Sequence, residues 1–129
     1  APYPGSVRLL DYLSTLDIQL AVVSSSANAD AVLRAAGLRD RFGVLVDGRV
    51  AAEAGLPGKP APDTYVHAAA LLDVAVDAAI VFEDAVSGVA AGRDGGFGLV
   101  VGVDRGAGAE LLRSSGADLV VADLDELVP

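Results

Sequence analysis

The sequence predicts an α/β domain with a Rossmann-like, three-layer architecture, in which a parallel sheet carries helices on both faces. Two observations lead to this class: short apolar runs rich in Val, Leu and Ile recur through the chain, and segments of helical periodicity separate them. Several runs are apolar almost throughout, as in parallel strands buried on both faces, and right-handed crossovers should connect them. The predicted strands are Ile18–Val23, Val44–Val46, Ala79–Phe82, Leu99–Val103 and Leu119–Val121.

The predicted helices lie between these strands. The first carries an apolar stripe formed by Val7, Leu10 and Leu13. Asn28 is expected to cap the second, over 29–36, and Gly37 supplies the left-handed residue that ends it. The other predicted helices begin after Pro62-Asp63, at about Ala85 and at about Ala109, and the last two end at Gly95 and Gly116.

Composition and charge exclude several classes of protein. The 129 residues include 9 basic and 18 acidic side chains, for a formal net charge of −9, and 53% are hydrophobic. The acidic balance argues against a nucleic-acid partner, and the absence of Cys excludes a thiol nucleophile or a Cys-ligated metal. No apolar run approaches the roughly 18 residues of a membrane span. We therefore expect one soluble, cytoplasmic domain over residues 1–129, with no membrane partner.

Polar residues follow the first predicted strand, at the edge of the sheet where ligands of open α/β sheets bind. Ser24, Ser25 and Ser26 come directly after this strand, and Asn28 stands where the next helix starts. Hydroxyl groups and free backbone N–H groups at a helix start attract anions. The alternative is ordinary helix capping, and these residues alone do not decide between the two.

Two adjacent carboxylates, Glu83 and Asp84, follow the third predicted strand. They could cap the next helix, but two acids beside a buried run lose solvation unless a cation offsets them. Mg²⁺ is typically held by one or two carboxylates together with water and a substrate phosphate. The pair therefore favours a magnesium site at the same edge of the sheet.

Lys59 is the only lysine, and it lies in Gly58-Lys59-Pro60-Ala61-Pro62-Asp63. The two prolines restrict the backbone around it, so it should occupy a defined place before a helix. A solvated loop lysine, with Asp63 capping that helix, is the alternative. Together with the serines and the acids, however, it completes the parts that phosphoryl transfer requires: an anion cradle, a fixed cation and a metal site.

Other interpretations of the sequence fit less well. The segment around Lys59 lacks the spacing of a P-loop and has no Ser or Thr after the lysine, and no Gly-x-Gly-x-x-Gly follows the first strand. His67 has no partner His or Cys and is expected to be a core or surface residue. The longest stretch without periodicity, Asp47–Ala61, is predicted to be a functional loop. A receiver-like signalling domain would need Asp47 as its phosphoacceptor, but Gly48-Arg49 after it is typical of a plain turn.

Three segments resemble the second, third and fourth motifs of the haloacid dehalogenase superfamily, in order and spacing, and within it the β-phosphoglucomutase-like subfamily. They are Leu20–Asn28, Gly58–Asp63 and Val81–Gly88. The resemblance implies a Mg²⁺-dependent mutase or phosphatase acting on a phosphorylated sugar.

The resemblance also implies a role for each matching residue. Ser24 and the amide of Ser25 would hold the transferring phosphoryl group, and Lys59 would be the catalytic cation that neutralises it. Ser26 and Asn28 would bind the substrate, and Glu83 and Asp84 would hold Mg²⁺.

The chain departs from the family's pattern in its first motif. The resemblance implies an Asp-x-Asp, with a nucleophile and a general acid/base, followed by a helical cap domain, and neither has a counterpart here. The nearest look-alike, Val121–Asp125, is interpreted as the last strand and a helix start. Ala27 also stands where the sugar mutases commonly carry a basic residue. Its presence weakens the case for a mutase relative to that for a phosphatase. We expect the chain to be the back half of such an enzyme and inactive alone.

In the family, the strand of the first motif lies between the strands that end here at Val23 and Phe82. We therefore expect these two strands to pair directly or to receive a strand from elsewhere, because a bare gap would leave backbone groups unpaired. A homodimer or a complementing N-terminal segment would supply it. The alternative function is a non-catalytic binding or assembly module with the same fold.

Overall fold

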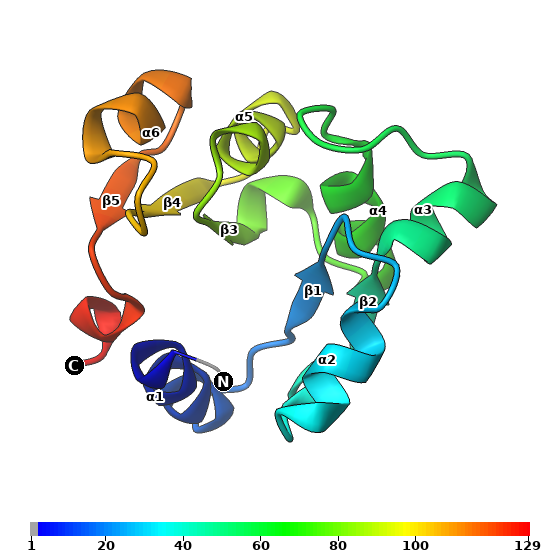
Figure 1. Ribbon diagram of the computed structural model, residues 1–129, viewed down its shortest axis with the longest axis horizontal. Coiled ribbons are helices and arrows are strands. Elements are labelled where there is room, and N and C mark those ends of the chain that lie inside the picture. The colour runs from blue at the N-terminus through cyan, green and yellow to red at the C-terminus, as the bar shows by residue number, and fades with distance from the viewer. Residues whose placement is uncertain (1–2) are drawn as a thin grey trace.

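The computed structural model describes residues 3–129 and confirms the α/β class (Figure 1). Each apolar run predicted as a strand contains one, although β1 takes up only the end of the run from Ile18 to Val23. Three single-turn 3₁₀ helices, η1 to η3, accompany the α-helices. In chain order the elements are α1 (Pro4–Ser14), β1 (Ala21–Val23), α2 (Ala29–Ala35), η1 (Arg39–Arg41), β2 (Val44–Val46), α3 (Gly48–Ala54), α4 (Asp63–Leu71), η2 (Val76–Ala78), β3 (Ile80–Glu83), α5 (Val86–Asp94), β4 (Leu99–Val103), α6 (Ala109–Ser115), β5 (Leu119–Val121) and η3 (Leu124–Leu127).

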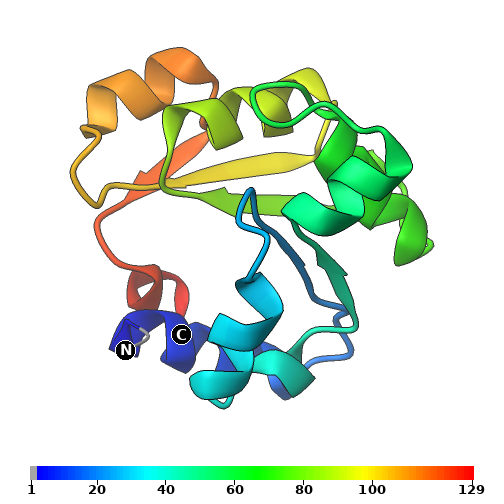
Figure 2. The ribbon, with the colours of Figure 1, turned by 45° about the vertical axis from the view of Figure 1, so that its right-hand side comes forward.

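The strands form two parallel sheets. One contains β1 and β2, with Val22 opposite Leu45, and the other contains β3, β4 and β5 in that order, with Phe82 opposite Val101. Within residues 3–129, β1 and β3 are not paired, so direct pairing, the first of the two expected arrangements, does not occur. The two sheets run in different directions (Figure 2), and the Lys59 side chain bridges the ends of β1 and β3. The expectation of a strand from elsewhere stays a prediction.

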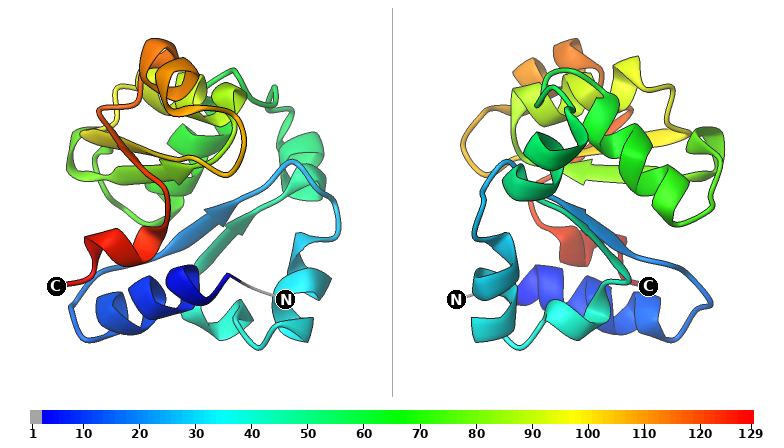
Figure 3. Two further views of the ribbon diagram at one scale, coloured as in Figure 1. Left: turned by 60° about the vertical axis from the view of Figure 1, so that its left-hand side comes forward. Right: turned by 90° about the vertical axis from the view of Figure 1, so that its right-hand side faces the viewer.

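Helices lie on both faces of the three-stranded sheet, as predicted. On one face, α5 packs against β3 and β4, and α6 packs against β4 and β5. On the other face, η3 contributes Leu124 and Leu127 to a cluster with Val101, Val103 and Val121, and α1 packs against η3 (Figure 3). Helix α4 contacts both strands of the smaller sheet. The look-alike at Val121–Asp125 is confirmed as the end of β5 and the start of η3.

Tyr65 of α4 joins the two parts of the fold. It is 8% exposed and belongs to a buried cluster with Val81, Val89, Ala91, Val100 and Leu112, against which Val23 of β1 packs. Its ring meets Phe97 edge-on, with the ring centroids 5.9 Å apart. Two residues on one side of β3 lack such cover: Ile80 is 54% exposed and Phe82 is 38% exposed.

The structure corrects the prediction for Asp47–Ala61, because this stretch contains helix α3 and is not an irregular loop. The Asp47 carboxylate caps the helix by accepting a hydrogen bond from the Val50 N–H group (2.9 Å), and Gly55 ends it with φ of 68°. This capping role also removes the basis for interpreting Asp47 as a phosphoacceptor. No helix within residues 3–129 is both long enough and apolar enough to cross a membrane.

Candidate functional site

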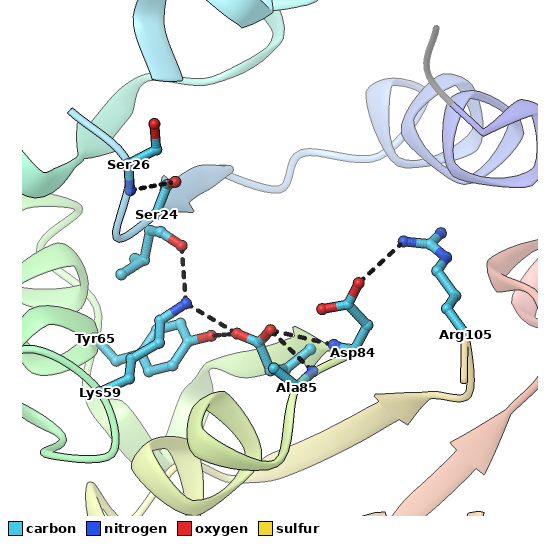
Figure 4. A network of polar contacts seen from close by, with 9 residues as sticks. Ser24, Ser26, Lys59, Tyr65, Asp84, Ala85 and Arg105 are labelled. Atoms are coloured by element: carbon cyan, nitrogen blue, oxygen red, sulfur yellow. Dashed lines mark hydrogen bonds and ion pairs between the residues drawn. The ribbon is translucent and has the colours of Figure 1, made fainter. Parts of the chain in front are cut away.

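The carboxyl ends of β1 and β3 meet at Lys59 (Figure 4). The Lys59 ammonium donates hydrogen bonds to the Val23 carbonyl oxygen (3.1 Å) and to Glu83 Oε2 (2.9 Å). The side chains of Lys59 and Glu83 are only 12% and 11% exposed, so this is a largely buried ion pair. The ends of β1 and β3 therefore come together, as the sequence predicted, although the two strands belong to different sheets and Lys59 links them.

The Glu83 carboxylate has a donor at each of its acceptor positions. Oε2 accepts from Lys59 and from the Tyr65 hydroxyl (2.5 Å), and Oε1 accepts from the backbone N–H groups of Asp84 (3.2 Å) and Ala85 (3.3 Å). Gly88 makes room for it, because a Cβ atom at position 88 would overlap Oε2. The carboxylate is thus held at the start of α5, where the helix dipole also favours negative charge.

The surroundings of Glu83 decide its charge. Burial raises the pKa of this carboxyl, but the hydrogen bond from Tyr65 and the charge and hydrogen bond of Lys59 outweigh burial and lower the pKa below its usual range. Burial and the negative charge of Glu83 both raise the pKa of Tyr65. At neutral pH Glu83 is therefore a carboxylate and Tyr65 a neutral phenol.

Ser24, Ser25 and Lys59 line one cavity of about 260 Å³, together with residues of α3, α4 and the loop between them. Ser24 Oγ accepts a hydrogen bond from the Ser26 N–H group (3.2 Å), which closes the turn after β1. The three residues predicted to bind phosphate are therefore neighbours. The cavity offers two serine hydroxyl groups and one cation.

Ser26 and Asn28 are exposed and bonded to one another at the start of α2. Ser26 Oγ donates to Asn28 Oδ1 and accepts from the Asn28 N–H group (3.3 Å). Asn28 stands at the N-cap position of α2, but its side chain makes no capping hydrogen bond, so the predicted cap is wrong. The Asn28 amide turns to Ser26 instead, which leaves both side chains on the surface.

Asp84 is more open than its neighbour Glu83. Its side chain is 50% exposed, and its one ion pair with the described part of the chain is a long contact of 4.0 Å to Arg105. Arg105 also donates to Ser6 Oγ (2.9 Å) and lies 3.9 Å from the centre of the Tyr3 ring. It thereby connects the beginning of α1 to the rim of the site.

The roles of Tyr65, Gly88 and Arg105 at the site were not predicted from the sequence. Tyr65 belongs to a helix of mostly apolar residues, and nothing in the periodicity shows that its hydroxyl meets Glu83. Gly88 stands in a run of small residues at a helix start, where a close approach is one of several reasons for glycine. Arg105 follows the end of β4, and a search of every strand end for polar residues would have found it.

The donor chemistry of the site fits Mg²⁺. Oxygen ligands suit this ion, which commonly takes one or two carboxylates and completes its shell with water and substrate phosphate. Within residues 3–129 no cluster of three or more His, Cys, Asp or Glu side chains is placed to hold a metal. The available protein ligand is Asp84, since Glu83 could reach an ion only by giving up a present partner.

The fold is a parallel α/β domain, and its strand ends carry serine hydroxyls, one buried lysine and adjacent carboxylates. These are the parts of a phosphoryl-transfer domain. The chain belongs to the haloacid dehalogenase-like hydrolases, because the model of that family matches residues 1–96. The resemblance seen in its three motifs is thereby confirmed.

The relatives agree with this family. A β-phosphoglucomutase of Mycobacterium bovis is 52% identical over 130 residues, which cover 98% of this chain and 49% of that protein. A β-phosphoglucomutase structure from Clostridium difficile has a TM-score of 0.83 and 30% identity, covering 96% of this chain and 51% of its own. A haloacid dehalogenase family hydrolase from Deinococcus radiodurans, solved with bound phosphate and sodium, has a TM-score of 0.83 and 32% identity. The match covers 97% of this chain and 56% of that one. The chain thus spans about half the length of each of these three proteins.

Proposed function

We propose that this chain is the core of an enzyme that transfers a phosphoryl group of a sugar phosphate with the help of Mg²⁺, as a β-phosphoglucomutase-like mutase or phosphatase. The observation that carries the proposal is the position of Lys59, which is buried beside Ser24 and Ser25 and tied to the ends of two strands. The relatives named β-phosphoglucomutase and the phosphate bound in the Deinococcus structure support the substrate class.

Each residue of the site has a role in this proposal. Ser24 Oγ and the Ser25 N–H group would donate hydrogen bonds to the phosphoryl oxygens, and Lys59 would neutralise the charge that they carry. The Lys59 ammonium has three protons and uses two in the present contacts, so one remains for a substrate oxygen. Ser26 and Asn28, which lie on the surface next to Ser24, would bind the rest of the substrate.

Mg²⁺ would be held by Asp84, with Glu83 beside it, and would withdraw charge from the phosphoryl group when bound. Asp84 suits this role because it is half exposed and only loosely paired with Arg105. Glu83 would act mainly through Lys59, since its present partners fill its acceptor positions.

We further propose that a strand from outside this chain lies between β1 and β3 and carries the nucleophilic Asp that the family resemblance implies. Among residues 3–129 no strand pairs with the free edge of β3 or with β1 on the side away from β2, and Ile80 and Phe82 are exposed; both observations support this arrangement. The 129-residue chain by itself would then bind phosphate and Mg²⁺ weakly and turn over nothing.

Titration calorimetry with inorganic phosphate, with and without Mg²⁺, tests the proposed site. Replacing Lys59 by Ala is expected to weaken phosphate binding at least about tenfold, because a charge-assisted contact is lost. Ser24→Ala is a second variant that leaves the buried ion pair in place, and it should weaken binding by a smaller factor. Arg49→Ala, which removes an exposed cation of α3, is the matched control and should bind as the unaltered chain does. Equal affinity in Lys59→Ala and Arg49→Ala would contradict the proposal.

A non-catalytic binding module with the same fold is the alternative function. It would also bind phosphate, but it would have no need for Asp84 as a metal ligand. Asp84→Asn is therefore expected to remove the effect of Mg²⁺ on phosphate binding. Asp73→Asn, at an exposed aspartate that follows α4, is the control. Unchanged Mg²⁺ dependence in Asp84→Asn would favour the alternative.

A further inference from the structure

The structure brings the Tyr65 hydroxyl and the Lys59 ammonium to the same oxygen atom of Glu83. Tyr65 donates to Oε2 over 2.5 Å and Lys59 donates to it over 2.9 Å. The Lys59 nitrogen also lies 4.9 Å from the centre of the Tyr65 ring, within the range of a cation–π contact. Tyr65 therefore contacts both members of the buried ion pair.

The role of this contact can be separated from core packing. The ring of Tyr65 fills the core beside Phe97, and a phenylalanine would fill it equally well. The hydroxyl adds no apolar contact, and within residues 3–129 its one hydrogen bond goes to Glu83. A buried carboxylate that lacks hydrogen-bond donors would rotate toward other donors. Each donor that it has therefore helps to fix the orientation of the carboxylate.

From this juxtaposition we propose that Tyr65 is a positioning residue, which holds the Glu83 carboxylate against Lys59 and so keeps the ammonium between the ends of β1 and β3. This role goes beyond the proposed phosphoryl transfer. It rests on that function only for the identity of the ligand that Lys59 would bind. Tyr65 is not among the residues that line the cavity with the serines. It acts on Lys59 mainly through Glu83.

The single lysine makes a direct test possible. In a chain labelled with ¹³C,¹⁵N-lysine, one side-chain ammonium resonance reports on Lys59 without further assignment. Its rate of proton exchange with water measures how continuously the ammonium is hydrogen-bonded. Tyr65→Phe is expected to raise this rate at least about threefold, the effect of losing one hydrogen bond. Tyr12→Phe, which alters a phenol on α1, is the matched control and should leave it unchanged.

A double-mutant cycle distinguishes action through Glu83 from a general loosening of the core. Glu83→Gln should raise the exchange rate of Lys59 further than Tyr65→Phe does, and adding Tyr65→Phe to it should change nothing more. An unchanged rate in Tyr65→Phe, or an equal increase in both backgrounds, would overturn the proposal.

A second variant reaches Glu83 from its other side. Gly88→Ala introduces a Cβ atom where Oε2 lies, so the carboxylate must move away while the Tyr65 side chain stays intact. It should reproduce the exchange rate of Glu83→Gln, and a rate equal to that of the unaltered chain would contradict the proposal. Binding of inorganic phosphate by the unaltered chain is measured separately. Its absence would refute the proposed function, while the Lys59 signal would still decide the role of Tyr65.

Discussion

Glu83 and Asp84 are neighbours in sequence with opposite surroundings. Glu83 is largely buried and accepts hydrogen bonds from four donors. Asp84 is half exposed, and among the described residues it has one distant ion-pair partner, Arg105. The sequence placed both acids at the right strand end, but its pattern does not distinguish them. Their difference arises from Tyr65, which comes from another helix, and from the space left by Gly88.

Removing the charge of Glu83 should destabilise the fold. Glu83→Gln leaves the buried Lys59 ammonium without its counter-ion, and we expect the free energy of unfolding at neutral pH to fall by about 3 kcal/mol. Urea unfolding of Glu83→Gln beside Glu53→Gln, an exposed glutamate of α3, measures this. Equal stability of the two variants would contradict the expected cost.

The same carboxylate should give the fold a dependence on acid pH. Its pKa in the folded chain lies below the ordinary 4.5 because its hydrogen bonds and Lys59 outweigh burial. Its contribution to stability is therefore present above about pH 4.5 and is lost as the pH falls through the lowered pKa. Urea unfolding across this range should show the loss in the unaltered chain and a flatter profile in Glu83→Gln. Parallel profiles would show that Glu83 does not carry this dependence.

Tyr65 should remain neutral in alkaline solution while the fold persists. Burial and the charge of Glu83 raise its pKa above the ordinary 10.0, so its stabilising effect is complete below about pH 10 and declines at higher pH as the unfolded chain ionises. Just above pH 10, the folded unaltered chain and the folded Tyr65→Phe variant should therefore show the same phenolate absorbance. In denaturant the two should differ by the ionised fraction of one tyrosine, and a difference of that size already in the folded state would contradict the assignment.

Among the elements, helix α3 shows most clearly what sequence periodicity can miss. Its seven residues carry no apolar stripe, and none of them is buried, so the pattern contains no helical signal. Local chemistry forms it: Asp47 caps its first turn and Gly55 ends it. Elements whose apolar residues face a core were predictable, as in β4, α5 and α6.

The connection before β4 depends on a glycine. Gly98 donates hydrogen bonds to the carbonyl oxygens of Val76 and Ala79, and a Cβ atom there would overlap the Asp77 carbonyl oxygen. Because that atom belongs to the backbone, Gly98→Ala should cost about 1–3 kcal/mol of stability. Gly43→Ala, at a position with nothing within 4 Å, is the control and should change stability little. Thermal unfolding compares the two, and equal midpoints would contradict the expected clash.

At the scale of the whole molecule, the two sheets are joined by side chains where no backbone ladder exists among the described residues. Lys59 connects the ends of β1 and β3, and Tyr65 packs against the larger sheet from a helix that covers the smaller one. The sequence could foresee that these strands would be neighbours, since the family resemblance places one strand between them. It could not foresee that Tyr65 would join the two sheets, because nothing in the pattern of α4 shows that its hydroxyl meets Glu83.

The most direct test of this account is an assay of sugar-phosphate turnover by the 129-residue chain, alone and mixed with the part of the Mycobacterium bovis relative that it does not match. We expect no turnover by the chain alone and Mg²⁺-dependent release or transfer of phosphate by the mixture, lost in Asp84→Asn. Mg²⁺-dependent turnover by the chain alone, abolished by Asp84→Asn, would contradict the view that a strand from outside this chain supplies the nucleophile.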